Sequence, residues 1–493
     1  MKAQHVDTSV IISGSRWVAV SQLAKQLTQV ATLIVLANIL DPSVFGVLAL
    51  ATIMTRFVDT VIGDLGTAAA IVQRQDLGPP QYSTIFWFNS AVGVGLTVAG
   101  ALISPWMQPV LGSELAVDVF RVAVLSFAIA GFGMVPLALL RHDLAYSRLV
   151  KVDILVVVVS TGVAVGGAIA GWGVWSLVIS SLCGGVAGTT GAWWQVSFRP
   201  TRSFDANHLR SVRSFSTNLS VFRLVNFVSQ FADRFLVARV FGDAAGGLYS
   251  QPNRLNQIPL EITAVMYRRI LFPAMSKMDG DRARMRSSFK RTVGVVLTAG
   301  APMSVPLIVL AYPLTDAVLG SKWVGVEPLI QIVSVIGLIQ LVSNSSGVVL
   351  QALGRTDVLL YRGIVIAIVL LGGYSIGLTI SVEAVAWGYL GAVALLLIPT
   401  LEVAFRHIDL GQREFWWSLR RQLLAIAAQF AATWGALQLL DGGSPWLPLI
   451  GASLVGAIAY GATLLVWRDP HLRDLLRIGL PPLERLLYRE TSP

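Results

Sequence analysis

The sequence predicts an all-α polytopic membrane protein with about 14 transmembrane helices, arranged as two pseudo-symmetric six-helix lobes and two extra C-terminal helices. Composition is the first observation behind this prediction. Hydrophobic residues make up 55% and charged residues 13% of the 493-residue chain, whereas soluble domains carry roughly 25% charged residues. The mean hydropathy is +0.69. The other two observations are long apolar runs and a regular alternation of the charges between them.

The apolar runs are long enough to cross a bilayer as helices. Each comes close to the roughly 20 residues that a helix needs to cross the hydrocarbon layer, and none shows the short alternating pattern of a transmembrane β-strand. The predicted spans are 17–40, 44–66, 83–106, 119–140, 152–171, 173–196, 215–240, 248–272, 292–314, 327–350, 360–379, 383–404, 422–440 and 446–467.

The cations outside these runs fall almost entirely on one side of the membrane. With the N-terminus inside, the inward segments hold most of the Lys and Arg residues, among them Arg141, Arg355 and Arg362, whereas the outward segments hold only Lys322. The positive-inside rule therefore predicts that both termini are cytoplasmic. The same asymmetry accounts for the net charge of +10, so nucleic-acid binding is not expected.

A faint internal repeat divides the chain. The stretch 37–47 aligns with 238–248, and 141–143 aligns with 355–357, at offsets of about 200 residues. Spans 1–6 and 7–12 are therefore predicted to form equivalent lobes. The predicted organisation is an N-lobe at 1–198, a basic linker at 199–214, a C-lobe at 215–405, a basic loop at 406–421, spans 13 and 14 at 422–467, and a cytoplasmic tail at 468–493.

Spans 1, 2, 7 and 8 are unusually polar for membrane helices. In spans 1 and 7 the polar side chains recur every three or four residues, so each set forms a stripe on one helix face. A Lys or Arg at mid-depth costs at least ~2.5 kcal/mol and must face water or a partner. We therefore predict a hydrated cationic cavity. Its cations are Lys25, Arg56, Arg223 and Arg254, and its polar lining is Gln22, Gln26, Gln29, Asn226, Gln230 and Gln257.

Such a cavity suits an anionic substrate, especially a phosphate-bearing one, because Arg matches phosphate oxygens in a bidentate manner. The acids on the same spans are candidates for relaying protons or binding a coupling cation; they are Asp59, Asp233 and Glu261. Simple ion pairing is the alternative, because Arg56 lies three residues before Asp59 and Arg234 follows Asp233.

The sequence lacks the signatures of enzymes and metal sites. No G-x-x-x-x-G-K-[ST] loop occurs, so ATP hydrolysis within this chain is not expected. The five histidines lack metal-ligand spacing. We therefore expect no enzyme activity, no metal and no cofactor, apart from coupling to a H⁺ or Na⁺ gradient. The outward segments are short, which disfavours an external active site.

Several stretches resemble a known family. Residues 45–48, 64–66 and 70–74 are similar to the colanic-acid exporter branch of the polysaccharide transporter family, and so are 249–274 and the turn at 320–323. The likeness covers most of residues 10–410. It implies the multidrug/oligosaccharidyl-lipid/polysaccharide (MOP) flippase superfamily, whose fold is two six-helix lobes around a central cavity, often with two added helices. The family lends no fixed site motif, so the cavity residues rest on periodicity alone.

The resemblance also implies a function. Relatives of this kind move undecaprenyl-diphosphate-linked oligosaccharide repeat units across the bacterial cytoplasmic (inner) membrane for surface polysaccharide biosynthesis, which implies alternating access through the cavity. The implied partners are the polyprenyl-diphosphate-linked oligosaccharide, membrane lipids, a polysaccharide polymerase and glycosyltransferases. Two alternatives stay open: a multidrug/cation antiporter of the same superfamily, whose cargo needs an acidic or aromatic cavity, and a membrane glycosyltransferase or polymerase.

Overall fold

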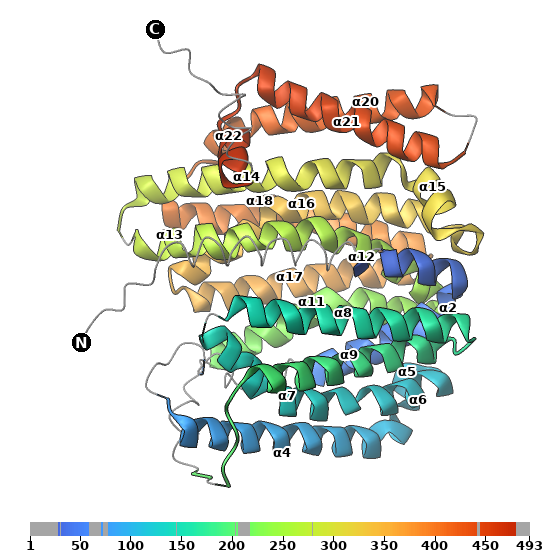
Figure 1. Ribbon diagram of the computed structural model, residues 1–493. Coiled ribbons are helices and arrows are strands. Elements are labelled where there is room, and N and C mark those ends of the chain that lie inside the picture. The colour runs from blue at the N-terminus through green and yellow to red at the C-terminus, as the bar shows by residue number, and fades with distance from the viewer. Residues whose placement is uncertain are drawn as a thin grey trace. The chain divides into compact units, whose positions relative to one another are not determined.

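The computed structural model describes residues 28–29, 31–58, 71, 77–143, 145–202, 204–205, 217–278, 280–440 and 444–479. In these residues every regular element is a helix (Figure 1). Nine of the helical segments described there are long and apolar enough to cross a membrane. The prediction of an all-α, multi-pass membrane protein is thereby confirmed, whereas the count of 14 crossings stays a prediction.

The helices follow one another along the chain with short connections. The first half forms α2 (Pro42–Val58), α4 (Pro79–Ile103), η2 (Ser104–Met107), α5 (Gln108–Leu111), α6 (Glu114–Ala123), α7 (Leu125–His142), α8 (Tyr146–Ile169) and α9 (Val174–Gln195). The second half forms α11 (Thr217–Phe241), α12 (Asp243–Met266), η3 (Tyr267–Leu271), α13 (Phe272–Lys277), α14 (Arg282–Val309), α15 (Ala311–Leu314), η4 (Thr315–Leu319), η5 (Ser321–Trp323), α16 (Glu327–Ala352), α17 (Thr356–Leu378), α18 (Val382–Ile408), α19 (Gln412–Ser418), α20 (Arg420–Leu439), α21 (Trp446–Val466) and α22 (Pro470–Gly479).

The chain divides into two compact units. Unit 1 runs to Phe227 and includes Arg234–Gly247, and unit 2 comprises Val228–Asp233 and the residues from Leu248 onward. In unit 1, α4 packs against α7 and α8 packs against α9. Residues 206–216 of the predicted linker lie outside the described residues, and the two-lobe layout stays a prediction.

Two glycines let α2 and the first turn of α12 approach closely within unit 1. A methyl group added at Gly46 would overlap the backbone carbonyl of Asp243, and one added at Gly247 would overlap that of Pro42. The sequence repeat aligns Pro42 with Asp243 and Gly46 with Gly247, so equivalent residues of the repeat contact each other reciprocally. Because the obstacle is backbone in both cases, neither position has room for a side chain.

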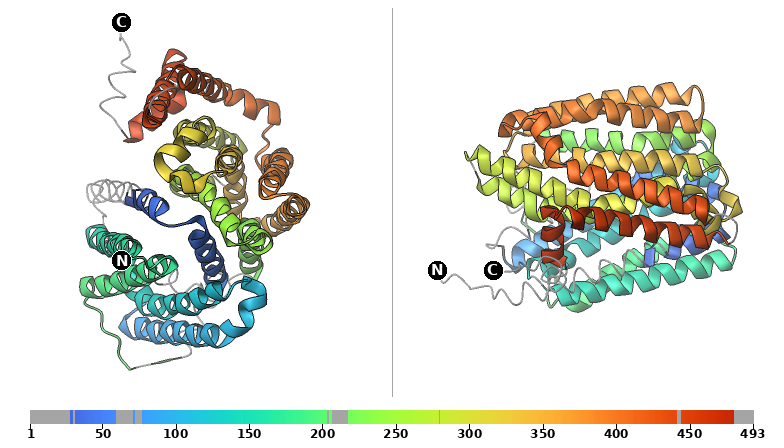
Figure 2. Two further views of the ribbon diagram at one scale, coloured as in Figure 1. Left: turned by 90° about the vertical axis from the view of Figure 1, so that its right-hand side faces the viewer. Right: turned by 90° about the horizontal axis from the view of Figure 1, so that it is seen from above.

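Unit 2 is built around α14, α16 and α18, which pack against one another, and α17 packs on α18. Its largest apolar cluster includes three fully buried rings, Phe289, Phe405 and Phe415. The ring centroids of Phe405 and Phe415 lie 4.9 Å apart, a separation typical of favourable aromatic pairs. The predicted spans 13 and 14 form the pair α20 and α21, and this pair packs on α14 (Figure 2).

Helix α14 begins earlier than the apolar run predicts. It starts at Arg282, whereas the predicted span begins at 292. The side chain of Asp281 accepts a hydrogen bond of 3.0 Å from the backbone N–H of Arg284, which is the usual N-terminal cap. Carboxylates then neutralise the basic first turns, and Lys290 Nζ lies 2.5 Å from Glu414 Oε1 of α19. That ion pair lowers the pKa of Glu414 below its usual value.

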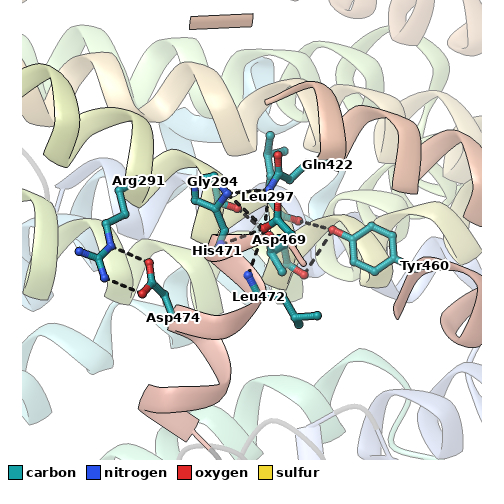
Figure 3. A network of polar contacts seen from close by, with 10 residues as sticks. Arg291, Gly294, Leu297, Gln422, Tyr460, Asp469, His471, Leu472 and Asp474 are labelled. Carbon is teal, nitrogen blue, oxygen red and sulfur yellow. Dashed lines mark hydrogen bonds and ion pairs between the residues drawn. The ribbon is translucent and has the colours of Figure 1, made fainter. Parts of the chain in front are cut away.

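A polar network fastens α22 to α14 and α20 (Figure 3). We call it the C-terminal clasp and define it as Arg291, Gln422, Asp469, His471 and Asp474. Gln422 Nε2 donates to both carboxylate oxygens of Asp469 at 3.0 Å, and both side chains are buried. Arg291 forms a two-point ion pair with Asp474, at 2.6 and 2.5 Å. Four helix-borne or loop-borne side chains thus tie the chain's last described helix to unit 2.

Asp469 is the centre of the clasp and also caps α22. It accepts hydrogen bonds from the backbone N–H groups of His471, at 2.8 Å, and Leu472, at 3.2 Å. Burial acts to raise the pKa of the Asp469 carboxyl, but the hydrogen bond and charge of His471 and the two backbone donors outweigh it, so the pKa lies below its usual value of 3.8. Asp469 is therefore ionised at neutral pH.

Candidate functional site

Helix α12 exposes a polar stripe. Arg254, Gln257 and Glu261 lie three and four residues apart and are all exposed, so they share one face of the helix. A charged face on a membrane helix is very unfavourable against hydrocarbon, and such faces in transporters border water or substrate. The predicted lining residues of span 8 therefore lie together on one accessible face.

Two prolines interrupt the backbone bonding of α12. Pro252 and Pro259 lie inside the helix and lack an N–H group. Side chains supply some of the hydrogen bonds to the carbonyls around them, since Asn253 Nδ2 donates to Tyr249 O at 3.1 Å and Thr263 Oγ1 donates to Pro259 O at 2.8 Å. Breaks of this kind are tolerated in membrane helices when neighbouring groups replace the lost bonds.

The buried side of α12 is polar as well, which the sequence analysis did not single out. Gln251 is 1% exposed and neither atom of its amide has a hydrogen-bond partner in the described part of the chain. Asn256 is 4% exposed, and its amide lies against Gly337 of α16, where a Cβ would overlap it. The signal that marks these residues is that polar residues occur on every face of this span.

Helix α11 carries the second predicted stripe. Asn226 and Gln230 are exposed, one turn apart on the same face. Asp233 is 1% exposed, so it is buried where its predicted neighbours are accessible. Arg223 lies in α11, but its side chain falls outside the described residues.

The predicted lining of spans 1 and 2 is described only in part. Gln29 is exposed, and Arg56 is exposed in the last turn of α2. The remaining candidates lie outside the described residues; they are Gln22, Lys25, Gln26 and Asp59. The convergence of four cations on one cavity therefore stays a prediction.

One cation lies elsewhere than the charge alternation placed it. Arg362 was assigned to an inward segment, but it lies within the membrane-spanning helix α17. Its guanidinium contacts α16, where Nη1 donates to Ser346 Oγ. The charge pattern misplaced this residue because it lies about two turns from the helix end, within the reach of a side chain to the interface.

These groups can bind but carry no reaction machinery in the residues that the structure describes. The accessible cations and amides offer N–H donors to oxyanions and hydroxyl groups. Among the described residues, no group of three His, Cys, Asp or Glu side chains is placed to hold a metal ion. The geometry is therefore that of a recognition surface for a polar or anionic cargo.

Comparison with known proteins decides the family. The family described as "Polysaccharide biosynthesis protein" matches residues 35–328. The chain belongs to this family. It is 27% identical to the teichuronic acid biosynthesis protein TuaB of Bacillus subtilis (strain 168), over 87% of this chain and 89% of that protein. It is 24% identical to the succinoglycan biosynthesis transport protein ExoT of Rhizobium meliloti (strain 1021), over 96% of each chain.

Solved structures show the fold of this family member. The lipid II flippase MurJ in an inward closed conformation matches with a TM-score of 0.71 at 12% identity, over 93% of this chain and 99% of that chain. An inward-facing multidrug resistance MATE family transporter of the MOP superfamily matches with a TM-score of 0.64 at 16% identity, over 78% and 94%. The resemblance predicted from sequence is thereby confirmed: the protein is a multi-pass membrane transporter with the MOP fold, from a polysaccharide biosynthesis family.

Proposed function

We propose that the protein is a flippase that moves undecaprenyl-diphosphate-linked oligosaccharide repeat units across a bacterial cytoplasmic membrane. The observation that carries this proposal is the accessible face of α12, where Arg254, Gln257 and Glu261 are exposed on one side of a helix. Membership of a polysaccharide biosynthesis family supplies the class of cargo. A diphosphate needs cationic donors, and sugars need amide and carboxylate partners, and this face offers both kinds of group.

The chemistry of the cargo explains why a polar path is needed. The diphosphate and sugars cannot cross hydrocarbon without a large desolvation penalty, whereas the polyprenyl tail is at home there. In the proposed mechanism the head group enters a hydrated cavity open to the cytoplasm, and the transporter then opens to the other side while the tail stays in the bilayer. Glycosyltransferases would build the repeat unit before this step, and a polymerase would use it afterwards.

The test is complementation of a deletion strain. Loss of the gene should remove the surface polysaccharide and cause lipid-linked repeat units to accumulate on the inner leaflet. The wild-type gene should restore export, whereas Arg254→Gln should reduce it by roughly 10- to 100-fold, the range for one charge-assisted hydrogen bond. Arg268→Gln is the matched control, because Arg268 is exposed in η3 and lies outside the stripe. A deletion strain with unchanged polysaccharide would refute the proposal.

The charge of the α12 face separates this function from multidrug antiport. The MOP fold serves both functions, as the MATE and MurJ likenesses show, so fold alone does not decide. A cationic drug requires an acidic or aromatic site. Reversing the charge with Arg254→Glu should therefore abolish oligosaccharide export, whereas for a drug antiporter it should leave drug resistance intact or increase it.

A further inference from the structure

Arg362 combines features that its role in helix packing leaves unexplained. It lies about two turns into α17, a helix apolar enough to span a membrane. Its side chain is partly covered by α16, and its Nε atom is buried with no hydrogen-bond partner among the described residues. Within that part of the chain it forms no ion pair with a carboxylate. A guanidinium inside the membrane region normally has a counter-charge.

The side of α16 that meets this guanidinium is shaped to receive it. Nη1 donates to Ser346 Oγ, and Nη2 lies 3.0 Å from the point where a Cβ on Gly347 would be. Gly347 therefore lets the guanidinium approach the α16 backbone closely. One hydroxyl is the single neutral acceptor that the described protein offers Arg362, so most of its donors face away from protein acceptors.

The same face of α16 presents two exposed amides. Asn344 and Gln351 lie three residues before and four residues after Gly347, so all three share one stripe of the helix. Both amides are exposed in an otherwise apolar spanning helix. Exposed amides in such a helix indicate a face that borders water or a polar ligand rather than hydrocarbon.

We propose that Arg362, Asn344 and Gln351 form an oxyanion site within unit 2 that takes the phosphate of a lipid head group. The phosphate would supply the counter-charge that Arg362 lacks in the described protein and the acceptors for its remaining N–H groups. The amides would donate to the other oxygens. Two lipids carry this chemistry: the diphosphate of the transported substrate, which rests on the proposed function, and an anionic phospholipid of the surrounding membrane.

Binding to the purified full-length protein in a neutral detergent tests this site. The two probes are undecaprenyl diphosphate and phosphatidylglycerol, each titrated against wild type, Arg362→Gln and Arg362→Lys. Arg362→Gln should weaken binding of at least one probe by roughly 10- to 100-fold, and Arg362→Lys by less, since Lys keeps the charge but loses the forked geometry. Arg355→Gln is the matched control, because Arg355 is exposed and already paired with Asp357.

A second variant keeps the test decisive if Arg362→Gln does not fold. Asn344 is exposed, so Asn344→Leu disturbs no packing contact and removes one amide donor. It should weaken the same probe by roughly 2- to 10-fold, as the loss of one neutral hydrogen bond does. Equal affinity of both probes for wild type, Arg362→Lys and Asn344→Leu would overturn the site.

The outcomes separate this inference from the proposed function. An effect confined to undecaprenyl diphosphate supports the site and assigns it to the substrate, whereas an effect confined to phosphatidylglycerol supports a site for membrane lipid. If the gene is required for surface polysaccharide but neither probe depends on Arg362 or Asn344, the site fails and the function stands. If binding depends on Arg362 but the deletion strain keeps its polysaccharide, the function fails and the site stands.

Discussion

Replacing Asp469 with Ala should release α22 from unit 2. The substitution removes the cap of α22, worth about 0.5–2 kcal/mol. It also leaves the amide of Gln422, which is fully buried, without the carboxylate that it donates to at 3.0 Å. An unpaired buried donor costs about 1–3 kcal/mol, so the combined loss is about 2–5 kcal/mol. Because each 1.4 kcal/mol is tenfold, the open form of α22 should be populated at least about 30-fold more often.

Hydrogen exchange of the α22 amides measures this opening directly. In the purified protein, the backbone N–H groups of residues 473–479 should exchange at least about 30-fold faster in Asp469→Ala than in wild type. Asp281→Ala is the matched control, because Asp281 caps α14 from an exposed position and no buried amide depends on it. That variant should accelerate exchange only in the first turn of α14. Exchange in α22 within threefold of wild type would refute the role of the clasp.

Three further predictions follow from the same coordinates. Because the pKa of Asp469 is lowered, its stabilisation of α22 should be complete above its usual pKa of 3.8 and lost as pH falls through the lowered value; α22 exchange that is unchanged between pH 7 and pH 3, after correction for the intrinsic rate, contradicts this. Gly46→Ala should lower the unfolding temperature through a loss of about 1–3 kcal/mol, because the methyl group meets backbone, whereas Gly95→Ala in α4 should not, since nothing lies within 4 Å of that Cβ. Glu261→Gln should abolish stimulation of transport by an imposed H⁺ or Na⁺ gradient in proteoliposomes; stimulation equal to wild type argues against Glu261 as the coupling acid.

Helix positions were predictable because hydropathy dominates them. The bounds of α9 and α16 differ from the predicted spans by at most two residues, since an apolar run in a membrane protein has few conformations open to it. The early start of α14 escaped prediction because its first turns are basic. A cap at Asp281 and an ion pair between Lys290 and Glu414, which are far apart in sequence, determine that start.

Side-chain partners between distant helices could not be predicted from periodicity. A stripe gives the face on which Arg254 or Gln230 lies, and the structure confirms exposure for both. Periodicity does not say which helix a face meets. The pairing of Gln422 with Asp469 and the approach of Arg362 to Gly347 depend on how whole helices pack. The sequence marks such sites only indirectly, through a glycine or an amide in an otherwise apolar run.

The two helices that fail the hydropathy criterion are the ones that carry the candidate site. Helix α11 has 25 residues and α12 has 24, which at 1.5 Å per residue is about 36 Å and longer than the hydrocarbon layer of about 30 Å. Neither is among the nine apolar segments in the described residues, because polar groups occupy positions that lipid-facing helices fill with apolar ones. A helix that is long enough to cross but too polar to face lipid must present that polarity to water or cargo. The shortfall in the apolar count is therefore itself an argument that α11 and α12 line the transport path.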